Sequence, residues 1–340
     1  MKTKIWFHFD NAPHVPILLP VATELERRGY EVIYSARDVS QTFDLLKMAH
    51  IQFEQFGGTF PKNSLLKLTY TLMWGIRLAL KMRKHGIACA MSHSSRSAIL
   101  AGWLLKIPTI AMYDYEYVNS FFQNNLASLV LMPEPVRDNG LREAGISLKN
   151  LEFYPGIKEQ LYLNDTHQFN PIKATNPEQI IVTIRLPGEG HYTNVHSEQL
   201  FDLILDNVMN YDNSYVILLP RSAEQRQRIV KRLNGQLGIK VHIPEKPIPT
   251  KDLILSSDVV IGSGGTMVRE AAVLGVPAYS FFLSKDGAVD KYLAQQERLI
   301  FIRNENDIRK IRIEKCREKK LLKTDVNQID WLCNRIEKCV

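Results

Sequence analysis

Short β-rich runs alternate with helical patterns along this chain, and that alternation constrains its fold more than any other feature. In the first half, strands are expected at Lys4–Phe9, Glu31–Ser35, Ile51–Phe56, Ala88–Ser92, Thr109–Tyr113, Leu129–Met132 and Leu151–Tyr154. Helices are expected between most of them, at Pro16–Arg28, Gln41–Ala49, Ser64–Lys84 and Ser97–Lys106. Such alternation predicts right-handed βαβ units on a parallel sheet with helices on both faces.

The pattern restarts after a polar, proline-containing stretch that ends at Gln179. Strands are then expected at Ile180–Ile184, Tyr215–Leu219, Lys240–Ile243, Val259–Gly262, Ala278–Phe282 and Leu299–Ile302. The expected helices are Ser197–Met209, Ala223–Leu233, Thr250–Ser256, Thr266–Leu274, Val289–Gln296, Glu305–Lys319 and, at the end, Val326–Cys339. We therefore predict two doubly wound Rossmann-like domains, at residues 1–158 and 159–325, with a helix at 326–340 that can pack back on the first.

Composition narrows the class of protein. A chain of 340 residues with 45% hydrophobic and 23% charged residues is typical of a globular protein of two domains. Its 4 cysteines form no CxxC pair and read as reduced thiols. The first residues lack the pattern of a signal peptide and no apolar run is long enough to span a bilayer, so we expect a cytoplasmic protein. Histidines and cysteines form no zinc motif, and we expect neither a metal nor another cofactor.

Positive charge is unevenly distributed. The sequence between Gln55 and Tyr113 contains no Asp or Glu, whereas the net charge of the whole chain is only +7. Within it, Ser64–Lys84 mixes aliphatic residues and a tryptophan with lysines and arginines. Such a helix either packs one face on the core and leaves a solvated basic edge, or lies on an anionic membrane through residues 62–85. Aromatic residues do not interleave with the bases as a stacking platform, so we expect no nucleic-acid partner.

The sharpest local motif is a glycine-rich turn between a strand and a helix. The apolar run Asp258–Ile261 leads into Gly262-Ser263-Gly264-Gly265-Thr266, and the expected helix follows at once. Free N–H groups and the positive end of the helix dipole at such a turn suit a pyrophosphate, and Glu270, one turn later, can accept the hydroxyls of a ribose. The alternative is a tight turn that only lets strand and helix pack. Because neither a Walker A sequence nor a dinucleotide fingerprint is present, a kinase or dehydrogenase is disfavoured.

Residues Gly262–Pro277 resemble the donor-binding motif of GT-B glycosyltransferases and of the UDP-N-acetylglucosamine 2-epimerases. This resemblance implies that Ser263, Gly264, Gly265 and Thr266 hold the donor diphosphate and that Glu270 holds its ribose. The whole chain is also similar to a family of predicted GT-B proteins with a strand, an Asp/Asn-Pro-Pro-His-like pattern, an Ala36-Arg37-Asp38 segment and a Gly-Gly-Thr-Met turn. It implies a GT-B fold, in which the two domains face across a cleft.

The loop after the first strand supplies a candidate base. The segment from Asp10 to Val32 resembles the opening of the peptidoglycan N-acetylglucosaminyltransferase, and His14 matches the histidine that ends its first loop. Asn-Ala-Pro here replaces the family's glycine-rich run. Inverting glycosyl transfer needs a base for the acceptor hydroxyl, which His14 can supply with Asp10 orienting it. The alternative is a histidine that caps or packs the first helix.

Three further loops carry candidate residues. Arg185 follows a strand and can neutralise the leaving diphosphate, or it is a solvated arginine paired with Glu189; His191 is a weaker candidate. Asp114 and Glu116 lie in Tyr113–Tyr117, where they can bind hydroxyls of the acceptor sugar or assist His14 in catalysis; the alternative is a structural loop. A third segment, Ser92–Arg96, suggests a catalytic triad, but no Gly-x-Ser-x-Gly elbow accompanies it, so a hydrolase is disfavoured.

The sequence therefore leads to a glycosyltransferase that moves a sugar from a nucleotide-sugar, expected to be a UDP-sugar, to a glycan or lipid-linked acceptor in cell-surface polysaccharide synthesis. An alternative on the same fold is a UDP-N-acetylglucosamine 2-epimerase, whose elimination chemistry needs several acid–base groups. A second alternative is a protein that binds nucleotide-sugars without catalysis.

Overall fold

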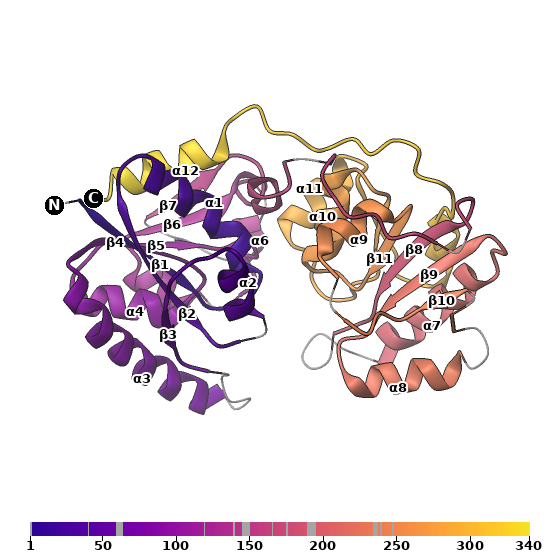
Figure 1. The fold of residues 1–340 in the computed structure, drawn as a ribbon, viewed down its shortest axis with the longest axis horizontal. Helices are drawn as coiled ribbons and strands as arrows, with labels where there is room; N and C mark the ends of the chain where they lie inside the picture. Colours follow the sequence, from indigo (N-terminus) through magenta and orange to yellow (C-terminus); the bar gives the residue numbers. More distant parts are fainter. Residues whose placement is uncertain are drawn as a thin grey trace. The chain divides into compact units, whose positions relative to one another are not determined.

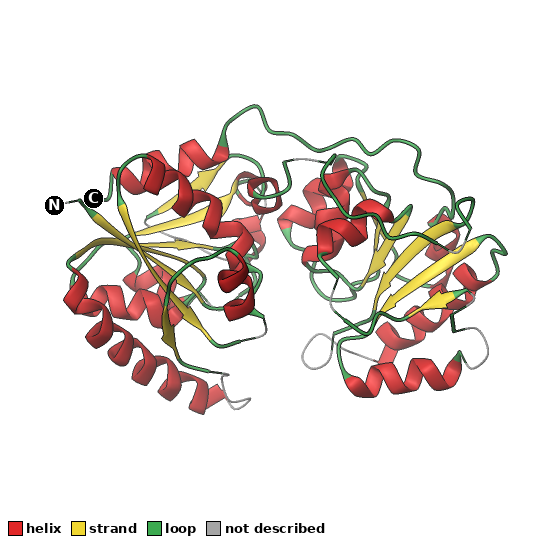
Figure 2. Cartoon of the chain, in the orientation of Figure 1, coloured by secondary structure: helices red, strands yellow, loops and turns green. Residues whose placement is uncertain are grey.

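The computed structural model of the chain consists of two compact units. Unit 1 contains Met1–Tyr162 and Thr324–Val340, and unit 2 contains Leu163–Lys323. The structure describes residues 2–39, 41–58, 64–118, 120–138, 140–144, 150–164, 166–174, 176–188, 195–233, 237–238, 240–246 and 248–340. Each unit is a sheet with helices on both faces (Figures 1 and 2).

Unit 1 has a seven-stranded sheet in the order β3-β2-β1-β4-β5-β6-β7, and every pairing in it is parallel. Its strands are β1 (Lys4–Phe9), β2 (Glu31–Arg37), β3 (Glu54–Phe56), β4 (Ile87–His93), β5 (Thr109–Met112), β6 (Leu129–Pro133) and β7 (Leu151–Tyr154). From β1 the chain adds strands first toward one edge of the sheet (β2, β3) and then, from β4 on, toward the other edge. The carboxyl ends of β1 and β4, where this order switches, are the usual place for a ligand in such sheets.

Helices cover both faces of this sheet. They are α1 (His14–Arg27), α2 (Thr42–Met48), α3 (Ser64–Met82), α4 (Arg96–Leu105), α5 (Phe121–Leu126), α6 (Gly140–Ala144) and α12 (Gln328–Glu337), with 3-10 turns η1 (Arg83–His85), η2 (Glu134–Val136) and η3 (Lys158–Leu161). Along β1 the side chains alternate: Ile5 and Phe7 pack in the cluster that includes α1 and α12, and Trp6 packs in the one that includes α3 and α4. Burial on both faces explains why the strand is an unbroken apolar run.

Unit 2 repeats the same topology. Its sheet has the order β10-β9-β8-β11-β12-β13, again with parallel pairings. The strands are β8 (Ile180–Arg185), β9 (Ser214–Leu219), β10 (Val241–His242), β11 (Val259–Gly262), β12 (Ala278–Ser280) and β13 (Leu299–Phe301). The helices are α7 (Val195–Met209), α8 (Ala223–Arg232), α9 (Thr250–Ser256), α10 (Thr266–Leu274), α11 (Ala288–Gln295) and the 3-10 helix η4 (Glu305–Lys310). The predicted doubly wound α/β architecture is confirmed in both units.

One predicted helix is wrong. Residues 305–319 were expected to be helical, but only η4 forms and the chain then runs without regular structure. Ile311 and Ile313 are buried while Arg312 between them is exposed, an alternation that a helix cannot give. The backbone N–H of Cys316 then donates to Asp258 Oδ1 at 3.0 Å. This tertiary contact replaces the hydrogen bond that the same N–H would make within a helix.

The terminal helix α12 packs within unit 1. Its Leu332, Cys333 and Ile336 are fully buried in the same cluster as α1. Arg28, at the end of α1, donates to Asp330 at 2.7 Å and to Glu337 at 3.1 Å, so ion pairs reinforce the apolar contact. Among the described residues, no helix is long and apolar enough to cross a membrane.

Candidate nucleotide and acid–base sites

The predicted donor-binding residues of unit 2 lie between β8 and β11, where the order of the strands in the sheet switches. Arg185 ends β8, Gly262 ends β11, and the two residues are register partners in neighbouring strands. Parallel α/β sheets bind ligands beyond the carboxyl ends of the strands at this kind of switch point. The structure therefore brings Arg185 next to the glycine-rich turn.

The glycines of this turn are required by its geometry. Gly264 and Gly265 have φ angles of +71° and +87°, in the left-handed region that L side chains rarely adopt. A Cβ atom on Gly264 would lie 2.8 Å from Phe282, so space excludes a side chain there as well. Successive backbone N–H groups in such a turn form a concave anion-binding surface.

The helix that follows the turn begins without a cap. Gly265 is the N-cap residue of α10, no side-chain cap hydrogen bond forms there among the described residues, and the first turn holds no acidic residue. Neither Ser263 nor Thr266 is the capping residue of this helix. By contrast, Ser95 caps α4 in unit 1 through the N–H of Ala98. Unsatisfied N–H groups and the positive dipole end favour an anion at the start of α10.

Arg185 adds positive charge beside this turn, and Arg221 lies close to Arg185. Burial, followed by the nearby charge of Arg221, lowers the pKa of Arg185 to about 10, and burial also lowers the pKa of Arg221. Both side chains remain cationic at neutral pH, and a polyanion would relieve their mutual repulsion. Arg221 donates from Nε to the carbonyl of Leu186 at 2.9 Å, which fixes one side of its guanidinium.

Glu270 is buried on α10, one turn after Thr266. Its neighbour Arg269 forms a double hydrogen bond to Asp290 of α11, at 2.7 and 2.8 Å, so α10 is anchored behind the turn. The ribose contact predicted for Glu270 stays a prediction. His191 and Glu189 lie outside the described residues.

In unit 1 the predicted acid–base residues also follow the carboxyl ends of central strands. His14 is the first residue of α1, and its Nδ1 accepts a hydrogen bond from the backbone N–H of Asp10 at 3.3 Å. Burial, followed by the charge of His93, lowers the pKa of His14 well below its usual value. The imidazole of His14 is therefore neutral at physiological pH.

The Asp10 carboxylate has other partners than His14. Arg37 Nε lies 2.9 Å from its Oδ1, and His8 lies 3.4 Å from the same atom. Burial raises the pKa of Asp10, but the His8 hydrogen bond and the charges of His8 and Arg37 outweigh it and bring it to about 2. The backbone of Asp10 orients His14, while its side chain anchors Arg37 beside the ring of Trp74.

A second histidine lies against His14. The rings of His14 and His93 have centroids 4.8 Å apart and are tilted by 46°. His93 ends β4, and its Nε2 lies 3.6 Å from Asp114 Oδ1. Asp114 in turn has Lys158 Nζ 2.6 Å from its Oδ2. The loops after β1, β4, β5 and β7 thus assemble one cluster, which we call the acid–base cluster: His14, His93, Asp114 and Lys158.

Local sequence patterns indicate part of this cluster. His14 and Asp114 were predicted as site residues, and His93 was considered only within the Ser92–Arg96 triad, which was then disfavoured. Lys158 was not predicted, since no local pattern distinguishes a lysine that a distant strand will bring to a carboxylate. The position of His93 at the end of a strand, with Ser94 after it in a left-handed conformation (φ 55°), was the available signal. Glu116 is buried in the same loop as Asp114, with 1% of its surface exposed.

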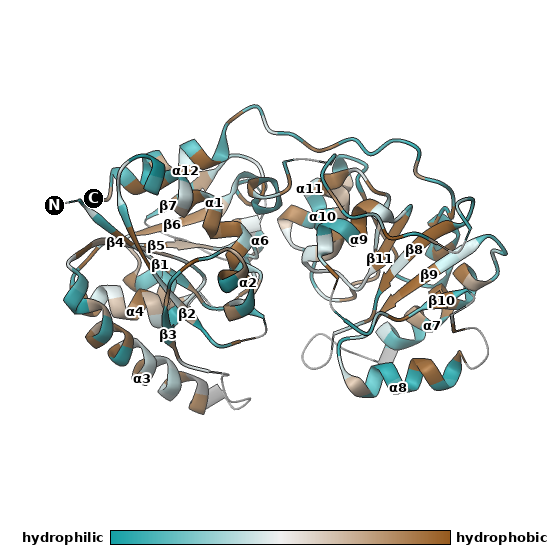
Figure 3. Cartoon of the chain, viewed as in Figure 1, coloured by the Kyte–Doolittle hydropathy of each residue, from teal (hydrophilic) through white to brown (hydrophobic). Residues whose placement is uncertain are grey.

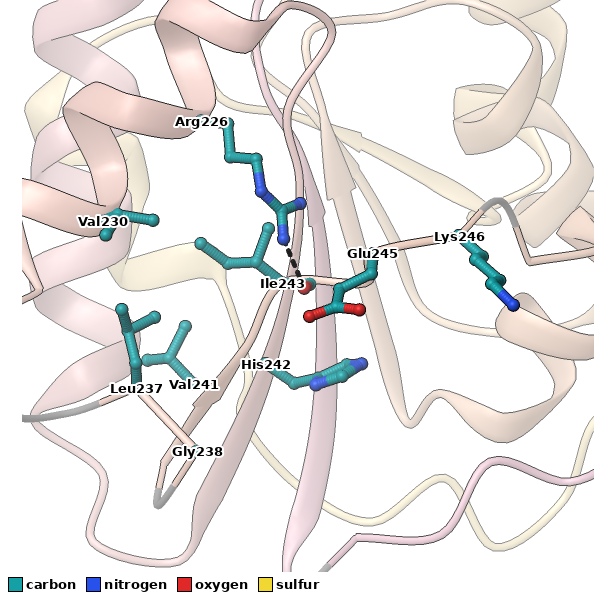
Figure 4. A pocket seen from close by; sticks show the side chains of 9 residues that line it. All are labelled: Arg226, Val230, Leu237, Gly238, Val241, His242, Ile243, Glu245 and Lys246. Carbon is teal, nitrogen blue, oxygen red and sulfur yellow. Dashed lines mark hydrogen bonds between the residues drawn. The ribbon is translucent and has the colours of Figure 1, made fainter.

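A pocket of unit 2 lies beside α8 and β10, away from the predicted donor-binding residues (Figure 4). Val230, Leu237 and Val241 line one part of it, and Arg226 donates to the backbone carbonyls of Ile243 and Pro244 at 3.2 and 2.8 Å. Strands β9 and β8 separate it from β11 and the glycine-rich turn. Among the described residues, no group of three or more His, Cys, Asp or Glu is placed to hold a metal ion.

Residues 3–339 match the model of a family described as a protein of unknown function, DUF354. The chain belongs to this family. This DUF354 protein contains both the glycine-rich turn, in unit 2, and the acid–base cluster, in unit 1. It is 26% identical over 320 residues to an uncharacterized protein of Methanocaldococcus jannaschii, with 90% of this chain and 89% of the relative covered.

Solved structures show the fold of this DUF354 protein. It is similar to the UDP-GlcNAc 2-epimerase of Methanocaldococcus jannaschii (TM-score 0.69, 13% identity, 99% of this chain and 100% of that one). The epimerase of Neisseria meningitidis bound to UDP-GlcNAc gives a TM-score of 0.68 at 14% identity, covering 90% and 89% of the two chains. MurG of Acinetobacter baumannii gives a TM-score of 0.55 at 14% identity, covering 98% of this chain and 99% of that one. These likenesses confirm the predicted GT-B fold.

Proposed function

We propose that this DUF354 protein is a metal-independent glycosyltransferase that moves a sugar from a UDP-sugar to an acceptor of cell-surface glycan synthesis. The uncapped N-terminus of α10, behind a left-handed Gly264-Gly265 turn, is the observation that carries the proposal. It leaves backbone donors for the diphosphate, and Arg185 and Arg221 supply the cations that offset its developing charge. Glu270 binds the ribose.

The acid–base cluster supports catalysis rather than binding alone. Glycosyl transfer needs a group that accepts the proton of the acceptor hydroxyl, and the acid–base cluster contains two neutral imidazoles, His14 and His93, of which one is sufficient. Asp114 and Lys158 beside them give the cluster a fixed charge pattern. A protein that only binds nucleotide-sugars has no need of such buried ionisable groups, whose desolvation costs stability.

A 2-epimerase is the second candidate. Elimination and re-addition of UDP at the sugar need more than one acid–base group, and two histidines, a carboxylate and a lysine meet in the acid–base cluster. Incubation with UDP-GlcNAc alone, followed by NMR of the anomeric protons, separates the candidates. A transferase leaves the sugar unchanged apart from slow hydrolysis, and an epimerase produces a second sugar isomer. A transferase assignment is overturned if that isomer accumulates.

We also propose that α3 contacts an anionic membrane surface, where a lipid-linked acceptor would lie. Leu68, Leu72, Ile76 and Leu80 recur every four residues and are 44–55% exposed. Apolar and polar residues alternate along α3 in Figure 3. Arg77, Arg83 and Lys106 are exposed in this acid-free part of the sequence, which matches a surface of anionic lipid.

Vesicle sedimentation tests this contact. The protein should sediment with phosphatidylserine-containing vesicles and not with purely phosphatidylcholine vesicles, and Leu72→Glu together with Ile76→Glu should abolish the binding. Leu203→Glu, at a 39% exposed leucine of unit 2, is the matched control and should bind as wild type does. Equal binding by the double variant and wild type would refute the contact.

A further inference from the structure

The hydrogen bond on His14 decides which of its nitrogens carries the hydrogen. Asp10 donates its backbone N–H to Nδ1 at 3.3 Å, so Nδ1 must present its lone pair. A neutral imidazole has one hydrogen, which then resides on Nε2. His14 also begins α1, where the helix dipole disfavours a positive ring. Burial lowers its pKa in the same direction.

A histidine in this state is a donor. Its Nε2 already carries a hydrogen and cannot accept the proton of a substrate hydroxyl, while its Nδ1 is held by the backbone. The neighbouring ring differs: His93 Nε2 faces Asp114 Oδ1 at 3.6 Å, and a carboxylate favours the hydrogen on the nitrogen that faces it. The Nδ1 atom of His93 then carries the lone pair, and in this structure it is buried without a hydrogen-bond partner among the described residues.

His93 is also the better buried of the two histidines. Only 7% of its surface is exposed, and neither of its ring nitrogens makes a hydrogen bond to another described residue. A buried imidazole without hydrogen bonds is costly unless a ligand supplies them. Its ring lies 4.8 Å from that of His14, and because His93 Nδ1 is buried, a substrate hydroxyl reaches it only when the groups that cover it move.

We infer that His93 is the base of this enzyme and that His14 is a neutral hydrogen-bond donor. The inference rests on the proposed transferase function. In the step, a lone pair of the acceptor hydroxyl forms the bond to the anomeric carbon while the bond to the diphosphate oxygen breaks. The diphosphate leaves with that electron pair, and the hydroxyl proton moves to His93 Nδ1. Asp114 faces the resulting imidazolium, and His14 Nε2–H donates to the substrate.

Asp114 and Lys158 are positioning residues in this scheme. Asp114 Oδ1, 3.6 Å from His93 Nε2, favours the hydrogen on that nitrogen, and Lys158, 2.6 Å from the other carboxylate oxygen, holds Asp114 in place. The roles of the two histidines thereby follow from the protein group that each ring faces: the backbone N–H of Asp10 for His14, and the carboxylate of Asp114 for His93.

Nitrogen-15 NMR of the full chain tests the tautomers directly. His14 should show the Nε2–H tautomer, with a pKa well below the ordinary value for histidine. A His14 ring that carries its hydrogen on Nδ1, or that titrates near pH 6.5, overturns the inference. This readout needs no substrate, so it is independent of the proposed function, which fails separately if the wild-type protein binds no uridine diphosphate.

Variants test the same assignment through turnover of UDP-GlcNAc, measured as release of uridine diphosphate. His93→Gln should lower kcat by about 100-fold or more, as expected for loss of a base. His14→Gln keeps an N–H donor and should retain most of the activity that His14→Ala loses. His50→Gln, at an exposed histidine of unit 1, is the control. If His14→Gln is as inactive as His14→Ala while His93→Gln is active, the roles are reversed and the inference is wrong.

Discussion

Lys158 Nζ lies 2.6 Å from Asp114 Oδ2, and only 8% and 11% of the two side chains are exposed. The lysine follows β7 and the aspartate follows β5, so β6 lies between their strands in the sheet. His93 lies on the other side of Asp114. Its pKa falls to about 4, because burial and the charge of Lys158 together outweigh the attraction of Asp114. The lysine therefore controls both the stability of unit 1 and the charge state of its neighbouring histidine.

Replacing Lys158 by methionine should remove that control. The variant leaves the buried Asp114 carboxylate without its cation, which typically costs about 3 kcal/mol in the free energy of unfolding. The pKa of His93 should rise, because the positive charge of Lys158 no longer adds to the effect of burial against the attraction of Asp114. Denaturant unfolding and NMR titration measure the two effects. Lys158→Arg, which keeps the charge, is the control, and an unchanged His93 pKa in the methionine variant would contradict the geometry.

Acid should destabilise unit 1 through His93. A folded-state pKa of about 4 lies below the ordinary histidine pKa of 6.5, so the unfolded chain binds the proton first as pH falls. The stabilisation is complete above pH 6.5 and is lost toward pH 4, which amounts to roughly 3 kcal/mol for this shift. Thermal unfolding of His93→Gln as a function of pH should show a shallower decline than wild type over that window. Parallel curves would show that His93 does not carry the loss.

The glycine-rich turn should not tolerate a side chain. Gly264→Ala places a Cβ 2.8 Å from Phe282 at a φ of +71°, and should weaken binding of uridine diphosphate by about tenfold or more, since every 1.4 kcal/mol is tenfold. Gly238→Ala has a similar φ of +81° with no atom within 4 Å of the new Cβ, so it carries the backbone strain without the clash. Calorimetric titration should find wild-type affinity in the control. Equal affinities in both variants would rule out the turn as the diphosphate site.

The terminal helix should contribute substantially to unit 1. Leu332→Ala empties a fully buried position in the cluster that α12 shares with α1, at a cost of about 3 kcal/mol. Val326→Ala, at a 46% exposed residue before the helix, should change the free energy of unfolding little. Urea unfolding followed by fluorescence measures both. A Leu332→Ala protein as stable as wild type would mean that α12 does not stay packed on α1.

Local patterns predicted the framework of both units because buried parallel strands are continuous apolar runs. Val259–Gly262 and Thr266–Leu274 were predicted with the bounds that the structure gives. The helix expected at 305–319 failed because Ile311 and Ile313 pack on unit 2 with the alternation of an extended chain. Periodicity over so few turns could not separate the two conformations.

The acid–base cluster was only partly predictable, for a different reason. His14 and Asp114 follow recognisable strands, whereas Lys158 enters through a short 3-10 helix after β7 and pairs with Asp114 only through the order of the sheet. The hydrogen bond to His14 Nδ1 depends on the exact turn between Asp10 and α1. Neither contact leaves a pattern in the residues themselves.

Isothermal titration of the wild-type protein with uridine diphosphate, uridine monophosphate and uridine tests the central claim most directly. If the uncapped start of α10, with Arg185 and Arg221, holds a diphosphate, affinity should fall in that order, and raised salt should weaken the diphosphate most. No heat of binding for uridine diphosphate, or equal affinity for the diphosphate and the bare nucleoside, would contradict it.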